Sequence, residues 1–129
     1  MKRKIPIAKP SFGNEEVAAV KEVLESGIVA SGPRTQTFEK EFAEYLGVDH
    51  AIAVTNGTVA LDVSLKVLEL GPGDEVITSS FSFVASGNCI LFQKSKPVFA
   101  DINPKTFNIE PSDVAEKITA KTKLIIPIH

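Results

Sequence analysis

The stretch EVITSSFSFVASGNCILFQKSKPVFA, residues 75–100, decides the fold of this 129-residue chain. Its first five residues, Glu75–Ser79, read as a short buried strand. Val84–Lys94 then predicts a helix, and Pro97–Ala100 predicts a second strand. Strands that alternate with helices are typical of a parallel sheet, because each crossover helix returns the chain to the same end of the sheet.

The same alternation continues on both sides of this stretch. Ala51–Val54 is an apolar run that predicts a strand buried on both faces, and residues 57–70 predict the helix that follows it. Further along, residues 111–119 predict a helix and residues 124–128 a strand. Residues 49–129 are therefore expected to form alternating β/α units with four parallel strands.

Residues 1–48 follow another pattern, which predicts an extended segment and two helices. The first helix is expected to begin at a cap, Asn14, and to end at Gly27. Residues 28–34 predict a loop. The second helix carries one apolar face and a terminating glycine, which are formed by Phe38, Phe42, Tyr45, Leu46 and Gly47.

Composition excludes several classes of protein. Fourteen Lys+Arg against sixteen Asp+Glu give a net charge of −2, and the one basic run, Lys2-Arg3-Lys4, predicts a solvated terminus, so no nucleic-acid partner is expected. The single cysteine, Cys89, cannot form an internal disulfide, and no Cys/His spacing indicates a metal site. Because no signal peptide or membrane-spanning run is present, we expect a cytoplasmic protein.

The last predicted strand has two apolar faces. Residues 124–128 are followed only by His129, and nothing remains to cover them. We therefore expect these 129 residues to be part of a longer polypeptide or a truncated product.

A first candidate site follows the strand predicted over residues 51–54. In Thr55–Thr58, Gly57 lets a ligand approach the backbone closely, and the start of the next helix favours an anion such as phosphate. The hydroxyl of Thr58 adds a donor. The alternative is a capped helix start without a ligand, and the segment matches neither the dinucleotide nor the P-loop phosphate fingerprint.

A second candidate segment, Ser79–Phe83, places two aromatic rings among hydroxyls at the end of a strand. The rings of Phe81 and Phe83 either stack on a planar cofactor or fill the core. Asp101 follows the next strand, but an aspartate before Asn103-Pro104 is more typical of a turn than of a ligand site.

Several motifs in fixed order resemble one enzyme family. SGPRTQTFEKEFAEYLG, TNGTVAL, GPGDEVITSSFSFVAS, PVFADINPKTFNI and TKLIIPIH are similar to the N-terminal part of the DegT/DnrJ/EryC1/StrS aminotransferases, over about residues 5–129. The resemblance implies the parallel-sheet core of a type I aminotransferase large domain, here truncated, and the cofactor pyridoxal 5′-phosphate. It also implies transfer of an amino group from glutamate to a keto carbon of a nucleotide-linked sugar, in a homodimer with active sites at the subunit interface.

The resemblance assigns roles to six residues. The family's phosphate-binding turn matches Asn56, Gly57 and Thr58, although the family commonly has Ser where this chain has Asn56. The aromatic residue that covers the cofactor ring matches Phe83. Ser31 and Gly32 match a loop near the nucleotide-sugar site, for which a simple connector is the alternative.

Four further positions carry weaker predictions. Asn88 matches an asparagine of the family, but it either binds a ligand or ties backbone segments together. Cys89 is expected to be a small core residue, and His50 to lie at the surface. His129 matches a histidine of the family and receives no role.

Pyridoxal phosphate chemistry requires a Schiff-base lysine and an acid beside the pyridine nitrogen. In the family both follow the residue that matches His129, and Asp101 is not the acid. The twelve lysines of the chain are expected in loops, at element ends or on polar faces. We therefore predict no transaminase activity for the chain alone, and two alternatives remain: a non-catalytic module that binds a phosphate ligand or a partner, and a sugar dehydratase of the same family in which His replaces the lysine.

Overall fold

A computed structural model describes residues 5–6 and 8–129, so the basic run Lys2-Arg3-Lys4 lies outside the described residues. Contacts within the chain divide it into two compact units, and the boundary along the sequence falls between Ala53 and Val54.

The first unit contains two helices, α1 (Asn14–Ser26) and α2 (Pro33–Leu46). Gly13, and not Asn14, is the residue that caps α1, and its N–H donates to the Glu16 carboxylate at 2.6 Å. The expected ends of both helices are confirmed. Gly27 and Gly47 adopt the left-handed conformation there, with φ of 73° and 69°, which glycine enters at little cost.

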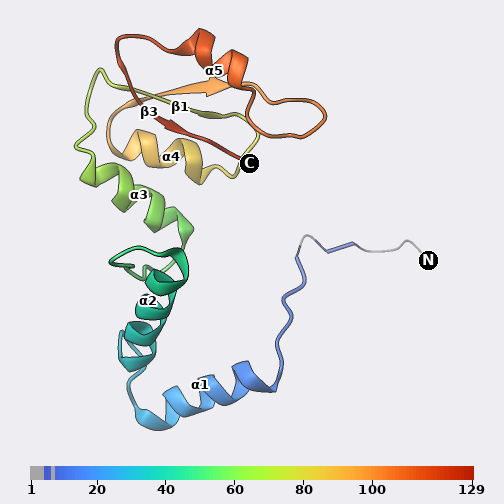
Figure 1. Cartoon of the computed structure of the whole chain (residues 1–129), viewed down its shortest axis with the longest axis vertical. Helices are drawn as coiled ribbons and strands as arrows, with labels where there is room; N and C mark the ends of the chain where they lie inside the picture. The colour runs from blue at the N-terminus through green and yellow to red at the C-terminus, as the bar shows by residue number, and fades with distance from the viewer. Residues whose placement is uncertain (1–4, 7) are drawn as a thin grey trace. The chain divides into compact units, whose positions relative to one another are not determined.

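The second unit is built on a three-stranded sheet with the order β2-β1-β3 (Figure 1). Its strands are β1 (Glu75–Ser79), β2 (Lys96–Ala100) and β3 (Thr122–Ile126), and both neighbouring pairs are parallel. β1 is buried along its whole length, as a strand between two neighbours and two helical layers should be. Pro97 lies on the edge strand β2, where its missing N–H is tolerated.

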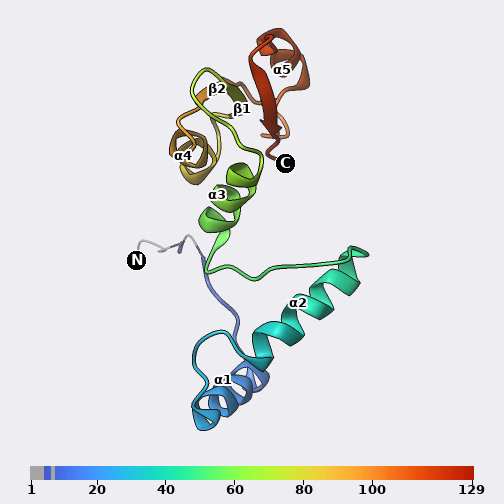
Figure 2. The ribbon, with the colours of Figure 1, turned by 90° about the vertical axis from the view of Figure 1, so that its left-hand side faces the viewer.

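Helices cover both faces of this sheet (Figures 1 and 2). On one face, α3 (Gly57–Val67) and α4 (Ala85–Phe92) pack over Val76 of β1, in a core that also contains Leu65, Cys89 and Ile90. On the other face, α5 (Pro111–Lys117) packs through Val114 against Ile77 and Ala100. The expected order of strands and helices from β1 to β3 is therefore confirmed.

One expected strand is absent. Ala51–Val54 has no strand conformation, so the described residues form three parallel strands instead of four. Ile52 is 84% exposed, although the prediction placed it in the interior. A strand needs a neighbour for its N–H and C=O groups, and none of the described strands pairs with this segment. The apolar pattern alone carries no information about that partner.

Candidate functional site

The first candidate segment forms the N-terminus of α3. Asn56 caps this eleven-residue helix, and its Oδ1 accepts the N–H of Val59 at 3.0 Å. The same side chain places Nδ2 3.5 Å from Thr55 Oγ1. The Asn56 carboxamide therefore caps the helix, and a contact between this side chain and a phosphate stays a prediction.

The backbone beside this cap is open. No hydrogen bond joins the N–H of Gly57 or of Thr58 to another described residue, as is usual for the first amides of a helix. A Cβ placed on Gly57 would meet no atom within 4 Å. Packing inside this chain therefore does not require glycine here, whereas a ligand that approaches the backbone does. Donors and space at the positive end of a helix suit an anion.

The second candidate segment, Ser79–Phe83, begins at the last residue of β1 and continues into the loop before α4, residues 80–84 (the β1–α4 loop). Phe83 is 74% exposed in this loop, so the alternative in which both aromatic rings fill the core is wrong. Phe81 is 59% exposed and rests against the ring of Phe107, with 5.7 Å between the ring centroids.

A hollow of about 370 Å³ opens beside Phe83. The hydroxyls of Ser82 and Ser86 lie 2.9 Å apart in its lining, and Asn88 lines it as well. No hydrogen bond joins the Asn88 side chain to another described residue. The alternative in which Asn88 ties backbone segments together is therefore not supported. Residues 56–58 do not line this hollow.

The two candidate segments lie at the same edge of the second unit. Figure 1 shows that α3 and α4 both begin on the side where the strands end. The helices pack against each other, and Gln93 just after α4 donates to the Asp62 carboxylate of α3 at 2.7 Å. Gly57 and Phe83 thus precede two helices that lie side by side, at the edge where open parallel sheets bind ligands.

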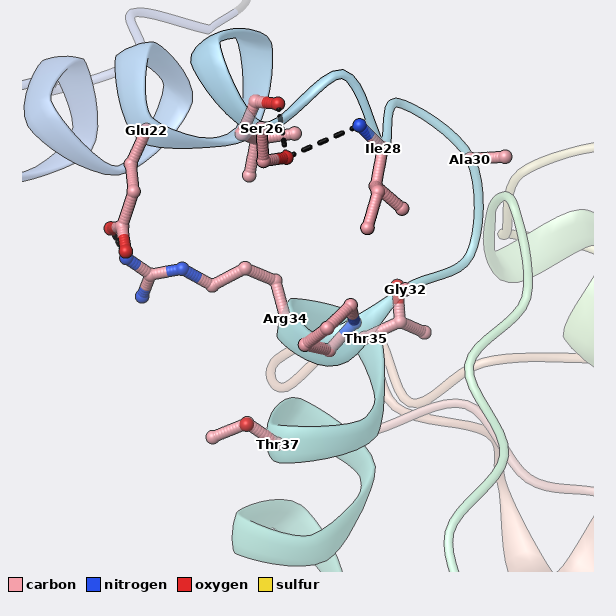
Figure 3. A pocket seen from close by; sticks show the side chains of 10 residues that line it. Glu22, Ser26, Ile28, Ala30, Gly32, Arg34, Thr35 and Thr37 are labelled. Carbon is pink, nitrogen blue, oxygen red and sulfur yellow. Dashed lines mark hydrogen bonds and ion pairs between the residues drawn. The ribbon is translucent and has the colours of Figure 1, made fainter.

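The residues Ser31 and Gly32 belong to the first unit. Gly32 lines a hollow of about 610 Å³ between α1 and α2, where Arg34 forms an ion pair with Glu22 (Figure 3). A Cβ on Gly32 would come within 2.6 Å of Ile28 Cγ2, so packing accounts for this glycine. Ser31 does not line the hollow, and a role in nucleotide-sugar binding stays a prediction for both residues.

The remaining candidates have structural explanations. Asp101 lies before the turn, which spans residues 104–106, and it is held by two hydrogen bonds: its Oδ1 accepts the N–H of Ile102 at 2.8 Å and its own N–H donates to Asp113 at 2.6 Å. Cys89 is fully buried, and burial raises the pKa of its thiol, as expected for a core residue. His50 is exposed, which confirms its expected place at the surface.

Residues 5–6 and 8–129 contain neither a cluster of metal-binding side chains nor a helix suited to span a membrane. No group of three or more His, Cys, Asp or Glu side chains there is placed to hold a metal ion. Within that part of the chain, no helix combines the length and the apolar character needed to cross a bilayer.

Comparison with known proteins decides the family. Residues 10–129 match the DegT/DnrJ/EryC1/StrS aminotransferase family. The chain belongs to this family. It is 46% identical over 125 residues to the spore coat polysaccharide biosynthesis protein SpsC of Bacillus subtilis (strain 168), a match that covers 97% of the chain and 32% of SpsC.

Solved structures of similar proteins confirm the α/β fold class. An aminotransferase from Psychrobacter cryohalolentis matches with a TM-score of 0.87 and 42% identity, over 96% of this chain and 32% of that chain. The Spr1654 protein of Streptococcus pneumoniae, in its PLP form, matches with a TM-score of 0.86 and 34% identity, over 95% and 31%. This family member therefore spans about a third of the length of the relatives it matches.

Sequence reasoning missed two features of the site. The Ser82–Ser86 hydroxyl pair had no helical signal, because Ser82 lies in the loop before α4. The contact between Phe81 and Phe107 had none, since 26 positions separate the two rings and only the tertiary structure brings them together.

Proposed function

We propose that this chain supplies the phosphate-holding and ring-covering part of a pyridoxal-phosphate-dependent aminotransferase that transfers an amino group from glutamate to a keto nucleotide-sugar. The observation that carries the proposal is the pair of free amides at Gly57 and Thr58, open to solvent at the same edge of the unit as the exposed ring of Phe83. Family membership and the PLP form of Spr1654 support the choice of cofactor.

Each residue has a distinct task in this proposal. The N–H groups of Gly57 and Thr58, with the Thr58 hydroxyl, bind the phosphate, and Asn56 holds the helix that presents them. Phe83 would cover the pyridine ring of the bound cofactor. When bound, the cofactor supplies an electron sink for chemistry at the amino-bearing carbon.

The relatives extend well beyond the third of their length that this chain matches. We place the Schiff-base lysine and the acid for the pyridine nitrogen there, and we expect a cytoplasmic homodimer whose nucleotide-sugar site includes Ser31 and Gly32. The chain covers only 32% of SpsC, which supports placing the lysine and the acid in the part of the relatives that this chain does not match.

Binding of pyridoxamine 5′-phosphate to the 129-residue chain tests the site, because this form of the cofactor lacks the aldehyde that reacts with surface lysines. Gly57→Ala is the decisive variant, since the structure leaves a new Cβ free of contacts and alanine suits a helix, so the variant should fold at least as stably as the wild type. We expect roughly ten- to hundredfold weaker binding, because the new methyl group keeps the phosphate from approaching the amides and so costs about one hydrogen bond to a charged group. Equilibrium dialysis measures the affinity, and urea unfolding measures the stability.

Phe83→Ala should weaken binding by about two- to tenfold, as removal of an aromatic stacking partner does. Phe92→Ala is the matched control, because Phe92 is also exposed, at 59%, and lies outside the hollow beside Phe83. Equal affinity in the wild-type chain and in both the Gly57 and Phe83 variants would overturn the proposal.

Exposed apolar side chains favour a second candidate function, a non-catalytic module that binds a partner. In the first unit they include Val17, Val20, Leu24, Phe38 and Phe42. Surfaces of this kind mark association sites. A single defined oligomer in size-exclusion chromatography would support the module, whereas heterogeneous aggregates would count against it. The dehydratase alternative depends on a residue beyond the matched part.

A further inference from the structure

The loop between β2 and α5, residues 101–110, is tied together along its length. At its tip, the N–H of Phe107 donates to the Asn103 carbonyl at 2.8 Å. The N–H of Asn103 donates to the Asn108 carbonyl at 2.9 Å, and its side-chain amide donates to Glu110 at 3.1 Å. An antiparallel bridge between Ile102 and Ile109 closes the base. The loop is therefore a fixed support for the side chain at its tip.

Phe107 at this tip has an unusual backbone. Its φ is 62°, in the left-handed region that bulky residues rarely adopt. Glycine would adopt this conformation at lower cost, so the turn itself gives no reason for an aromatic side chain. The reason lies in the ring, which packs on Phe81 with a centroid separation of 5.7 Å and an interplanar angle of 33°.

Phe81 begins the part of the β1–α4 loop that leads to Phe83. Its N–H donates to Ser79 Oγ at 3.1 Å, so the loop is anchored to the end of β1. On the far side of Phe83, the Phe83 carbonyl accepts the N–H of Ser86 at 3.0 Å, and Ser82 pairs with the Ser86 hydroxyl. At the start of the loop, the N–H of Ser80 donates to the Ala100 carbonyl of β2 at 3.2 Å. The contact with Phe107 adds a support at Phe81 from the loop between β2 and α5.

We propose that Phe107 is a positioning residue, which acts through Phe81 to hold the β1–α4 loop so that the ring of Phe83 faces the cofactor. This inference rests on the proposed function of Phe83. Phe107 itself makes no contact with the cofactor in this account.

Two substitutions separate the ring contact from the turn. Phe107→Gly relieves the left-handed backbone but removes the ring, whereas Phe107→Tyr keeps the ring. Amide hydrogen exchange of the full chain, followed residue by residue by NMR, should show about two- to tenfold faster exchange at Phe81 and Ser86 in the glycine variant. The tyrosine variant should restore the wild-type rates, and Phe92→Ala should leave them unchanged.

The same variants are then compared for pyridoxamine 5′-phosphate binding. We expect Phe107→Gly to lower the affinity by a factor no larger than Phe83→Ala does, and Phe107→Tyr to restore it. Unchanged exchange at Phe81 and Ser86 would overturn the inference, and so would faster exchange with wild-type affinity. If the wild-type chain does not bind this ligand, the proposed function fails, while the exchange rates still decide whether Phe107 anchors the loop.

Discussion

At the scale of single residues, Glu75 shows how this fold keeps a charge at the buried beginning of β1. Its side chain is 10% exposed, and its carboxylate accepts hydrogen bonds from Lys96 Nζ at 2.9 Å and from Thr119 Oγ1 at 2.7 Å. The hydrogen bond from Lys96, and then that from Thr119, lower the pKa of the Glu75 carboxyl. One side chain thus connects the first residues of two strands with the turn before the third.

This connection predicts a pH dependence of stability. Because the pKa of Glu75 is lower in the folded state than in the unfolded chain, its contribution is present above the ordinary glutamate pKa of about 4.3 and is lost as the pH falls through the folded-state value. Glu75→Gln should therefore flatten the decrease in unfolding free energy at acidic pH, measured by urea unfolding. Glu116→Gln on the exposed side of α5 is the control. Equal acid sensitivity of the Glu75 variant and the wild type would contradict the assignment.

At the scale of elements, α4 has one face in the core and one face in solvent. Ile90 is fully buried among Leu65, Val76 and Cys89, whereas the next residue, Leu91, is 55% exposed. Strand β1 supplies the surface that this helix covers, and the two together support the β1–α4 loop. The packing of α4 is therefore the link between the core and the candidate site.

A pair of neighbouring substitutions tests this packing. Ile90→Ala should lower the unfolding free energy by about 2–5 kcal/mol, because it removes buried methyl groups and leaves a cavity. Leu91→Ala should change it by no more than about 0.5 kcal/mol, because the side chain is mostly in solvent. Urea unfolding of both variants measures the difference, and similar losses at the two positions would show that α4 is oriented differently.

At the scale of the whole molecule, the described lysines lie where the sequence predicts them. They are exposed, with the exception of Lys117, which is half-buried beside Asp113. None of them lies in the hollow beside Phe83. Among the described residues, no lysine therefore places an amine in that hollow.

Borohydride reduction tests whether a lysine of this chain lies at the candidate site. After incubation of the chain with pyridoxal phosphate and reduction, mass spectrometry should find scattered, low-level modification of exposed lysines, since none of the described lysines lines the hollow beside Phe83. Glutamate and a keto nucleotide-sugar should give no transamination product. A stoichiometric phosphopyridoxyl adduct on a single lysine would refute this prediction.

The sequence by itself determined the features whose hydrogen bonds are local. The glycines that end α1 and α2 were predictable for this reason. The strands from β1 to β3 pair with distant segments, and they were predictable from the short apolar runs that alternate with helical patterns. A helix satisfies its own backbone, and its caps lie within a few residues, so neighbouring side chains carry the information. The open amides at Gly57 belong to this class as well.

Only the tertiary structure decided the features that need a distant partner. Residues 51–54 have the composition of a buried strand, yet without a neighbour to accept their backbone hydrogen bonds they remain irregular. The exposure of Phe83 and the packing of Phe81 on Phe107 likewise follow from where the loops after β1 and β2 meet. Contacts between segments far apart in the chain depend on packing, which no local pattern encodes.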